Sequence, residues 1–374
     1  MPSRMVEHFP GNLFGPGQAV DLNLDQIMAG ERVLICGLGL TFIDVVALLT
    51  EGRGGRYSDD GHGKWTYHTS GEEPLILAAS RRGMLPLPKP SALAGAGNRP
   101  PLRRINSAHA VELLSGPMLS PGTTAERVIA LMEAELQSQG LGEHPLRELN
   151  GALQVDSAPT LQVHDVVLGS IRRNCALENA SDVHLVLSAA IDVIAAPALA
   201  AKTEQSENAR EILDALATNS ARFTSGPPAF RLEQLQALAK AGVLRFLGSG
   251  AVPDSASRQP RLRTRQLPDG VTGHHLIHAR VPTPHASYLP EISGSRSWPL
   301  NSTGKVRINP DSFTVRWNDN GREDEGRVVL AGAMTDLGAL GSLPRAESDS
   351  GFFLQNRRIV RALYRRMTRD GLNA

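Results

Sequence analysis

The chain has 374 residues, enough for roughly two or three domains with a full hydrophobic core. Lys and Arg number 39 against 38 Asp and Glu, a net charge of +1, which excludes a uniformly basic surface for nucleic acid or anionic membranes. Two cysteines are too few for a disulfide framework or a four-thiolate zinc site. The start of the chain lacks the apolar core of a signal peptide, and the longest apolar stretch, 184–201, contains Asp192 and Pro197. We therefore expect no membrane span and a cytoplasmic location.

The first hundred residues predict a β-α-β unit. Residues 1–30 form an N-terminal segment without a core of its own. Apolar residues at 32–36 predict a buried strand, and those at 40–50 predict a helix packed on several sides. Glycine and polar residues fill 52–73, which is typical of a hairpin, and 75–79 predicts a second buried strand. Strand, glycine turn, helix and strand follow in the order of a β-α-β unit.

The middle of the chain predicts helices. After a proline- and glycine-rich stretch, Thr123 and Glu126 have the spacing of a capping box at a helix start. Apolar residues recur at three- and four-residue spacing through a helical region that ends near residue 220, with helices expected at 124–138, 158–177, 181–196 and 205–218.

The last third returns to mixed structure. A helix at 231–241 ends at Gly242, and an amphipathic helix carrying several arginines covers 352–369. With 4% aromatic residues for base stacking and a neutral chain, we do not expect nucleic acid on that helix. Strands are predicted at 243–247, 275–281, 313–317 and 327–331.

The clearest chemical motif is Gly37-Leu38-Gly39-Leu40-Thr41-Phe42, between the first strand and the first helix. Gly37 permits a sharp turn, and Gly39 lets a diphosphate approach the backbone at the helix N-terminus. Phe42 stands where the full fingerprint has a third glycine. The motif therefore predicts a dinucleotide site, and the alternative is a plain tight turn.

A second motif, Ser80-Arg81-Arg82, follows the next strand, where a β-α-β site meets the adenosine ribose. An acidic residue would select NAD at this place, whereas two guanidinium groups suit a 2′-phosphate. We therefore predict NADP(H) as cofactor, with a solvated basic loop as the alternative.

Other chemistry finds little support. His274 and His278 have the spacing of a helical metal pair, but 275–281 alternates like a strand and no carboxylate lies between them, so we expect no metal. No nucleophile elbow and no P-loop occur. Cys36 is expected to pack as a small apolar residue.

Residues 19–83 resemble the NADP-binding half of bacterial FAD/NAD(P)-binding flavoproteins, which are distantly similar to flavin-dependent amino-acid N-hydroxylases and monooxygenases. The resemblance implies that Gly37, Gly39 and Thr41 line the NADP diphosphate. It also implies that Ser80, Arg81 and Arg82 bind the 2′-phosphate. The matching stretches are VDL at 20–22, CGLGLTFID at 36–44, ALLTEGRGGR at 47–56 and ASRRG at 79–83, with weaker similarity at 227–248 and 352–356.

The fold class expected from these observations is α/β. A Rossmann-like NADP-binding region at 31–120 is followed by a helical insertion at 121–225, and 226–374 completes the α/β region and returns toward an FAD-type domain. Flavoproteins of this kind begin with a separate FAD fingerprint. Residues 11–17 are no substitute because no apolar strand precedes them. We therefore expect FAD, by resemblance, to be shared with an FAD-binding partner chain or within a homodimer.

Two functions stay open. The first is the NADP(H)-binding part of a flavin-dependent, monooxygenase-like oxidoreductase with a small-molecule substrate. The second is a non-catalytic NADP-binding sensor or subunit that needs a partner. A short-chain dehydrogenase is disfavoured because no Tyr-x-x-x-Lys occurs, and no catalytic residue can be assigned.

Overall fold

The computed structural model divides into two compact units. The first unit lies within 1–93, 140–184 and 221–282, and the second within 94–139, 185–220 and 283–374. The structure describes residues 12–61, 64–89, 101–106, 108, 111–112, 121–141, 152–176, 180–202, 212, 216, 222–254, 259–281, 297–301, 304–309, 312–319, 322–330, 332, 334–335 and 351–372.

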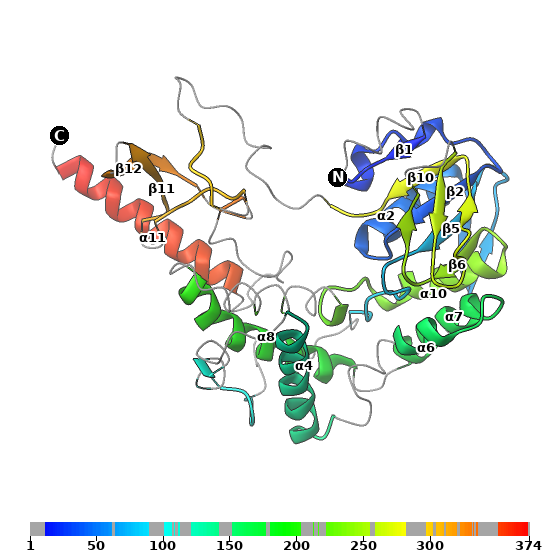
Figure 1. Cartoon of the computed structure of the whole chain (residues 1–374), viewed down its shortest axis with the longest axis horizontal. Helices are drawn as coiled ribbons and strands as arrows, with labels where there is room; N and C mark the ends of the chain where they lie inside the picture. Colours follow the sequence, from blue (N-terminus) through cyan, green and yellow to red (C-terminus); the bar gives the residue numbers. More distant parts are fainter. Residues whose placement is uncertain are drawn as a thin grey trace. The chain divides into compact units, whose positions relative to one another are not determined.

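The first unit is built on a five-stranded parallel sheet with the strand order β1-β10-β2-β5-β6 (Figure 1). Its central strands are the buried apolar runs of the sequence, so the strands predicted at 32–36 and 75–79 are confirmed. In chain order the strands are β1 (Leu13–Phe14), β2 (Arg32–Cys36), β5 (Leu75–Ala79), β6 (Leu244–Gly248) and β10 (His275–His278).

Helices cover one face of the sheet. These are α2 (Leu40–Leu49), α7 (Val163–Cys175) and α10 (Ala229–Lys240), whose buried apolar side chains share one core with Val33, Ile35 and Ile277 of the strands. The large side chains Phe42 and Phe246 meet there with ring centroids 6.4 Å apart.

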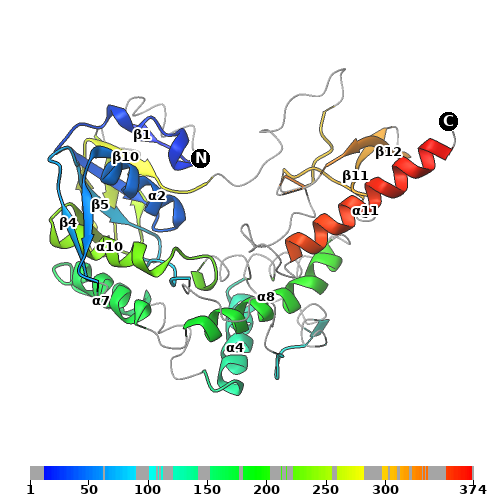
Figure 2. The same cartoon turned by 180° about the vertical axis from the view of Figure 1, so that it is seen from behind.

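The predicted excursion between α2 and β5 is a hairpin. Strands β3 (Arg56–Asp59) and β4 (Trp65–His68) pair antiparallel, and β4 lies beside α10 (Figure 2). Tyr67 of the hairpin is buried and donates its hydroxyl to Glu73 at 2.7 Å.

A small antiparallel sheet covers the other face. It consists of β7 (Val252–Pro253), β8 (Arg261–Arg263) and β9 (Val271–Thr272), and Leu262 of β8 packs with Leu34, Leu77 and Leu276 of the large sheet. The chain passes through this small sheet on its way from β6 to β10. The connection from β2 to β5 therefore crosses one face of the large sheet, and the connection from β6 to β10 crosses the other.

The N-terminal segment joins the common core. Two short 3₁₀ turns, Ala19–Asp21 and Leu24–Gln26, bury Ala19, Leu24 and Ile27 against α2 and the strands, and a third lies at Glu51–Arg53. The pairing of β1 with β10 was not predicted, because two residues carry no readable alternation.

Two predicted helix starts are wrong. The helix expected from 158 begins at Val163. It follows a turn in which the carbonyl of Pro159 accepts the N–H groups of Gln162 and Val163, and α6 (Ala152–Ser157) is a separate helix before that turn. The helix expected to be capped by Thr123 is α4 (Pro121–Ser138), with proline as its first residue, where its missing N–H costs nothing.

The second unit holds α4 and most of α8 (Ala180–Lys202), which is longer than the predicted 181–196. It also holds an antiparallel pair, β11 (Thr314–Asp319) and β12 (Arg322–Val329), and the terminal helix α11 (Gly351–Leu372). Helix α11 lies beside this pair (Figure 2), and its Ile359 packs with Phe313 and with Val315 and Trp317 of β11. The helix predicted at 205–218 lies outside the described residues, apart from 212 and 216.

A buried carboxylate anchors the second unit. Glu135 of α4 accepts the backbone N–H groups of Arg103, Arg104 and Ile105 at 2.7–2.9 Å and the amide of Gln139 at 2.9 Å. Burial alone would raise the pKa of Glu135, but these hydrogen bonds hold it below its ordinary value of 4.5.

Glu135→Gln is therefore expected to destabilise the protein at neutral pH and to matter less in acid. Because the pKa is lowered in the folded state, the stabilisation is present above about pH 4.5 and is lost as the pH falls through the folded-state pKa. Urea unfolding at pH 7 and pH 3.5 measures the difference between the variant and the wild type. Glu126→Gln, an exposed change on the same helix, is the control. A difference that stays constant with pH would contradict the assignment.

No helix among the described residues is long and apolar enough to cross a membrane.

Candidate functional site

The turn after β2 lies at the carboxyl edge of the sheet. Gly37 has a φ of +125°, and its N–H donates to the carbonyl of Ala79 at the end of β5 at 2.8 Å. A Cβ on Gly37 would lie 2.6 Å from the carbonyl oxygen of Ala279. Position 37 therefore requires glycine, because its φ is positive and because the chain after β10 passes too close to leave room for a side chain.

Gly39 differs from Gly37 in its surroundings. It is the N-cap of α2, with a φ of −86° that any residue can adopt, and no side chain caps the helix there. A Cβ on Gly39 would meet nothing within 4 Å. The first N–H groups of a helix have no acceptor within the helix, and the dipole makes this end positive. The turn thus leaves room for an anionic group at the start of α2, next to the buried Thr41 and Leu38.

The second predicted motif forms a braced turn at the same edge. The hydroxyl of Ser80 accepts the N–H of Gly83 at 2.9 Å. The carbonyls of Arg81 and Ser80 accept the N–H groups of Gly250 and Ala251 at 2.9 and 3.2 Å. Because these hydrogen bonds fix its backbone, the turn holds its two arginines in a fixed position beside the Gly37 turn.

The charge on this turn is not balanced by an ion pair among the described residues. Arg81 is exposed and Arg82 is half-buried. Burial, and then the neighbouring charge of Arg81, lowers the pKa of Arg82. Like charges held together in a partly buried place favour an anion.

A third guanidinium, that of Arg222, was not predicted from the sequence. Burial, and then the charge of Arg82, lowers the pKa of Arg222 to about 10, so the two groups are near enough to interact. The carbonyl of Arg222 accepts the N–H of Leu87 at 2.8 Å, which ties this segment to the chain after β5. Arg222 follows a stretch outside the described residues, and no local pattern signalled its place.

A second Gly-x-Gly follows β6, but it does not form an open turn. The side chain of Gln266 fills the space beside Gly248, and its amide oxygen accepts the N–H of Ser249 at 3.0 Å. The chain continues from Gly250 into β7 instead of a helix. This turn therefore lacks both the space and the helix N-terminus that a dinucleotide needs.

His274, just before β10, and His275, its first residue, have structural contacts. His274 accepts the N–H of Arg32 through Nδ1 at 2.8 Å, and Nε2 of His275 lies 2.8 Å from a carboxylate oxygen of Glu31. The part of the chain that the structure describes contains no group of three or more His, Cys, Asp or Glu placed to hold a metal.

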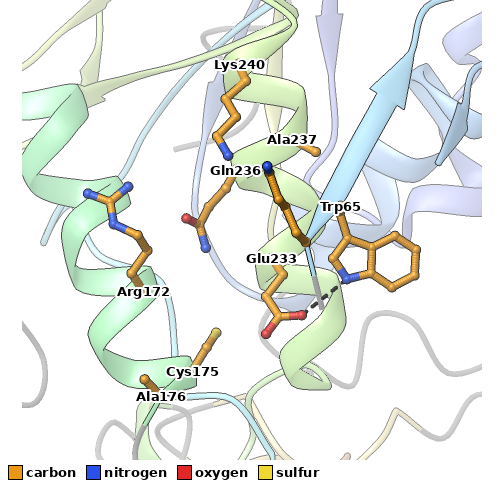
Figure 3. A pocket seen from close by; sticks show the side chains of 9 residues that line it. Trp65, Arg172, Cys175, Ala176, Glu233, Gln236, Ala237 and Lys240 are labelled. Carbon is orange, nitrogen blue, oxygen red and sulfur yellow. Dashed lines mark hydrogen bonds between the residues drawn. The ribbon is translucent and has the colours of Figure 1, made fainter. Parts of the chain in front are cut away.

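A cavity of about 310 Å³ lies between α7, α10 and the β3–β4 hairpin (Figure 3). The Trp65 indole N–H donates to Glu233 at 3.2 Å across it. Burial, and then the charge of Glu233, raises the pKa of Cys175 to about 12, so this thiol stays protonated near neutral pH. The predicted site residues do not line this cavity, whose walls are Lys64, Trp65, Arg172, Cys175, Ala176, Glu233, Gln236, Ala237 and Lys240.

Three curated proteins are similar to this chain. Nitrosuccinic acid synthase npaA of Aspergillus oryzae is 29% identical over 334 residues, 72% of this chain and 49% of that protein. An L-aspartate N-monooxygenase (nitrosuccinate-forming) of Streptomyces davaonensis is 26% identical over 325 residues, 71% of this chain and 49% of its own. One of the same name from Streptomyces cremeus is 48% identical over 79 residues, 21% of this chain and 11% of that protein.

The chain thus spans about half the length of the two relatives that it matches over most of its own length. No protein-family model matches it. The expected resemblance to N-hydroxylating monooxygenases agrees with the names of these relatives.

Proposed function

We propose that this chain is the NADP(H)-binding part of a flavin-dependent, monooxygenase-like oxidoreductase with a Rossmann-type nucleotide domain. The observation that carries the proposal is the pairing of two features at one sheet edge. One is the open helix N-terminus at Gly39, and the other is the braced turn with Arg81 and Arg82. The names of the relatives support the monooxygenase class.

The residues present fit NADP(H). The backbone N–H groups that begin α2 would hold the diphosphate, with Gly39 leaving space for it and Thr41 close by. Arg81 and Arg82 would pair with the 2′-phosphate, which NADH lacks, while Ser80 holds their turn in shape. When bound, the nicotinamide supplies a hydride.

The side chain of Gln266 fills the glycine turn after β6, so this turn is not a candidate for FAD. FAD is proposed from the resemblance, shared with an FAD-binding partner chain or with a second copy of this chain. By the names of the relatives, the small-molecule substrate to test first is L-aspartate, with oxidation at its amine.

The second candidate function is a non-catalytic NADP(H) sensor or subunit. It requires only the nucleotide site at the Gly37 turn, and no flavin site on this chain.

Titration of the purified chain with NADPH, followed by addition of FAD and L-aspartate, tests the nucleotide site and whether copies of this chain suffice for the enzyme. NADPH oxidation that requires both additions would support the enzyme, in which a second copy supplies the flavin site. Tight NADPH binding without oxidation would leave the sensor or a separate FAD chain. An NADPH affinity too weak to detect would contradict the NADP(H) site itself.

A further inference from the structure

The carboxyl end of β10 brings three functional groups together. His278, the last residue of β10, is the register partner of Cys36, the last residue of β2. Side chains alternate along a strand, so His278 shares a face with Leu276, as Cys36 does with Leu34. Leu276, Leu34 and Cys36 pack in one cluster, which places the imidazole and the thiol on the same face of the sheet.

His278 carries a buried polar atom without a hydrogen bond. Its side chain is 7% exposed, and Nε2 has no partner among the described residues. A buried polar group left unpaired costs about 1–3 kcal/mol, so such an atom is usually completed by a ligand or water. In the neighbouring His275, Nε2 pairs with Glu31, and the buried Nδ1 has no hydrogen bond.

A cation lies beside this imidazole. Burial raises the pKa of Cys36 and lowers that of His278, and the charge of Arg280, two residues beyond His278, lowers both. Arg280 is exposed and has no ion pair among the described residues. Its backbone is fixed, because its N–H donates to the carbonyl of His278 at 2.8 Å and its carbonyl accepts the N–H of Gly17 at 3.1 Å.

These groups lie where the strand connections go to opposite sides of β2. From β2 the chain passes through α2 to β5 on one side, whereas β10 flanks β2 on the other side and is reached across the opposite face. In open parallel sheets, ligands occupy the crevice at such a place, outside the carboxyl ends of the strands. The β5 side of this edge carries Arg81 and Arg82, so a dinucleotide held there would extend across β2 toward β10.

We infer that Arg280 and His278 receive the nicotinamide half of NADP(H), Arg280 at the phosphate on the nicotinamide side and His278 at the adjoining ribose. This inference rests on the proposed NADP(H) site and assigns its second half. A neutral imidazole suits a ribose hydroxyl, since it can donate or accept one hydrogen bond. The guanidinium suits the negative charge next to it.

The test compares two ligands on the full chain: NADPH, and adenosine 2′,5′-bisphosphate, which lacks the nicotinamide half. Arg280→Ala is expected to weaken NADPH about 10- to 100-fold, the range for one hydrogen bond to a charged group, and to leave the bisphosphate within about twofold. His278→Gln, which keeps a polar side chain, is expected to weaken NADPH alone by about 5- to 10-fold. The Arg81→Ala plus Arg82→Ala variant should lose affinity for both ligands.

Each outcome has a distinct meaning. Equal losses of both ligands in Arg280→Ala, or unchanged NADPH affinity in it, would overturn the inference while leaving the NADP(H) site in place. Failure of the wild-type chain to bind either ligand would overturn the proposed function instead. If thermal unfolding shows that His278→Gln is misfolded, Arg280→Ala decides alone, since its side chain is exposed.

Discussion

Gly39→Val is expected to abolish NADPH binding and to leave the fold intact. The backbone at Gly39 has an ordinary φ of −86°, and an added Cβ would meet no protein atom within 4 Å, so neither backbone strain nor a clash of the Cβ opposes the change. The same side chain would occupy the space over the first N–H groups of α2, where the diphosphate must lie. Isothermal titration should show affinity weakened by at least 100-fold, about 2.8 kcal/mol.

Gly37→Val is the matched control for this change. At Gly37 the φ of +125° and the carbonyl oxygen of Ala279, only 2.6 Å from where a Cβ would lie, make any side chain costly to the fold itself. Backbone strain of this kind costs of order 1–3 kcal/mol before the steric clash is added. Circular dichroism and urea unfolding should therefore show a destabilised Gly37 variant beside a normal Gly39 variant. Unchanged NADPH affinity in Gly39→Val would place the diphosphate elsewhere.

Arg81→Ala combined with Arg82→Ala is expected to weaken NADPH by about 2–4 kcal/mol and to leave NADH nearly unaffected. Hydrogen bonds to charged groups contribute about 1.5–3 kcal/mol each, and only NADPH carries the 2′-phosphate that receives them. Stability should not fall, because the change removes a repulsion between two neighbouring cations that also lowers the pKa of Arg82.

The measurement is a pair of titrations, NADPH and NADH, on the variant and on a charge-matched control. Arg172→Ala plus Arg173→Ala removes an adjacent, exposed arginine pair from α7 and should leave both affinities unchanged. An equal loss of affinity for NADPH and NADH in the variant lacking Arg81 and Arg82 would contradict the assignment of the 2′-phosphate to these arginines.

The local part of the site could be predicted from the sequence. The runs at 32–36 and 75–79 are apolar at every buried position, and the Gly37 turn lies between a strand and a helix, so short-range patterns identify β2, α2 and β5. The glycine-rich stretch between α2 and β5 likewise indicates its hairpin.

The long-range part could not be predicted. His278 and Arg280 reach the Gly37 turn only because β10 pairs with β2 across about 240 residues, and nothing local specifies that pairing. The spacing of the histidines in the sequence suggests only a comparison with metal sites. The burial of His278 and the lack of a hydrogen bond at its Nε2 are visible only in the fold. The covering layer of β7, β8 and β9 is built from strands of two or three residues, too short to show alternation.

The proposed NADP(H) site at the carboxyl edge of this sheet selects nucleotides that carry the 2′-phosphate. Parallel titrations of the wild-type chain with NADPH and NADH test it most directly. We predict one NADPH bound per chain, with an affinity at least about 30-fold above that for NADH, as two charged contacts to the phosphate require. Equal affinities for the two nucleotides, or binding of neither, would contradict the claim.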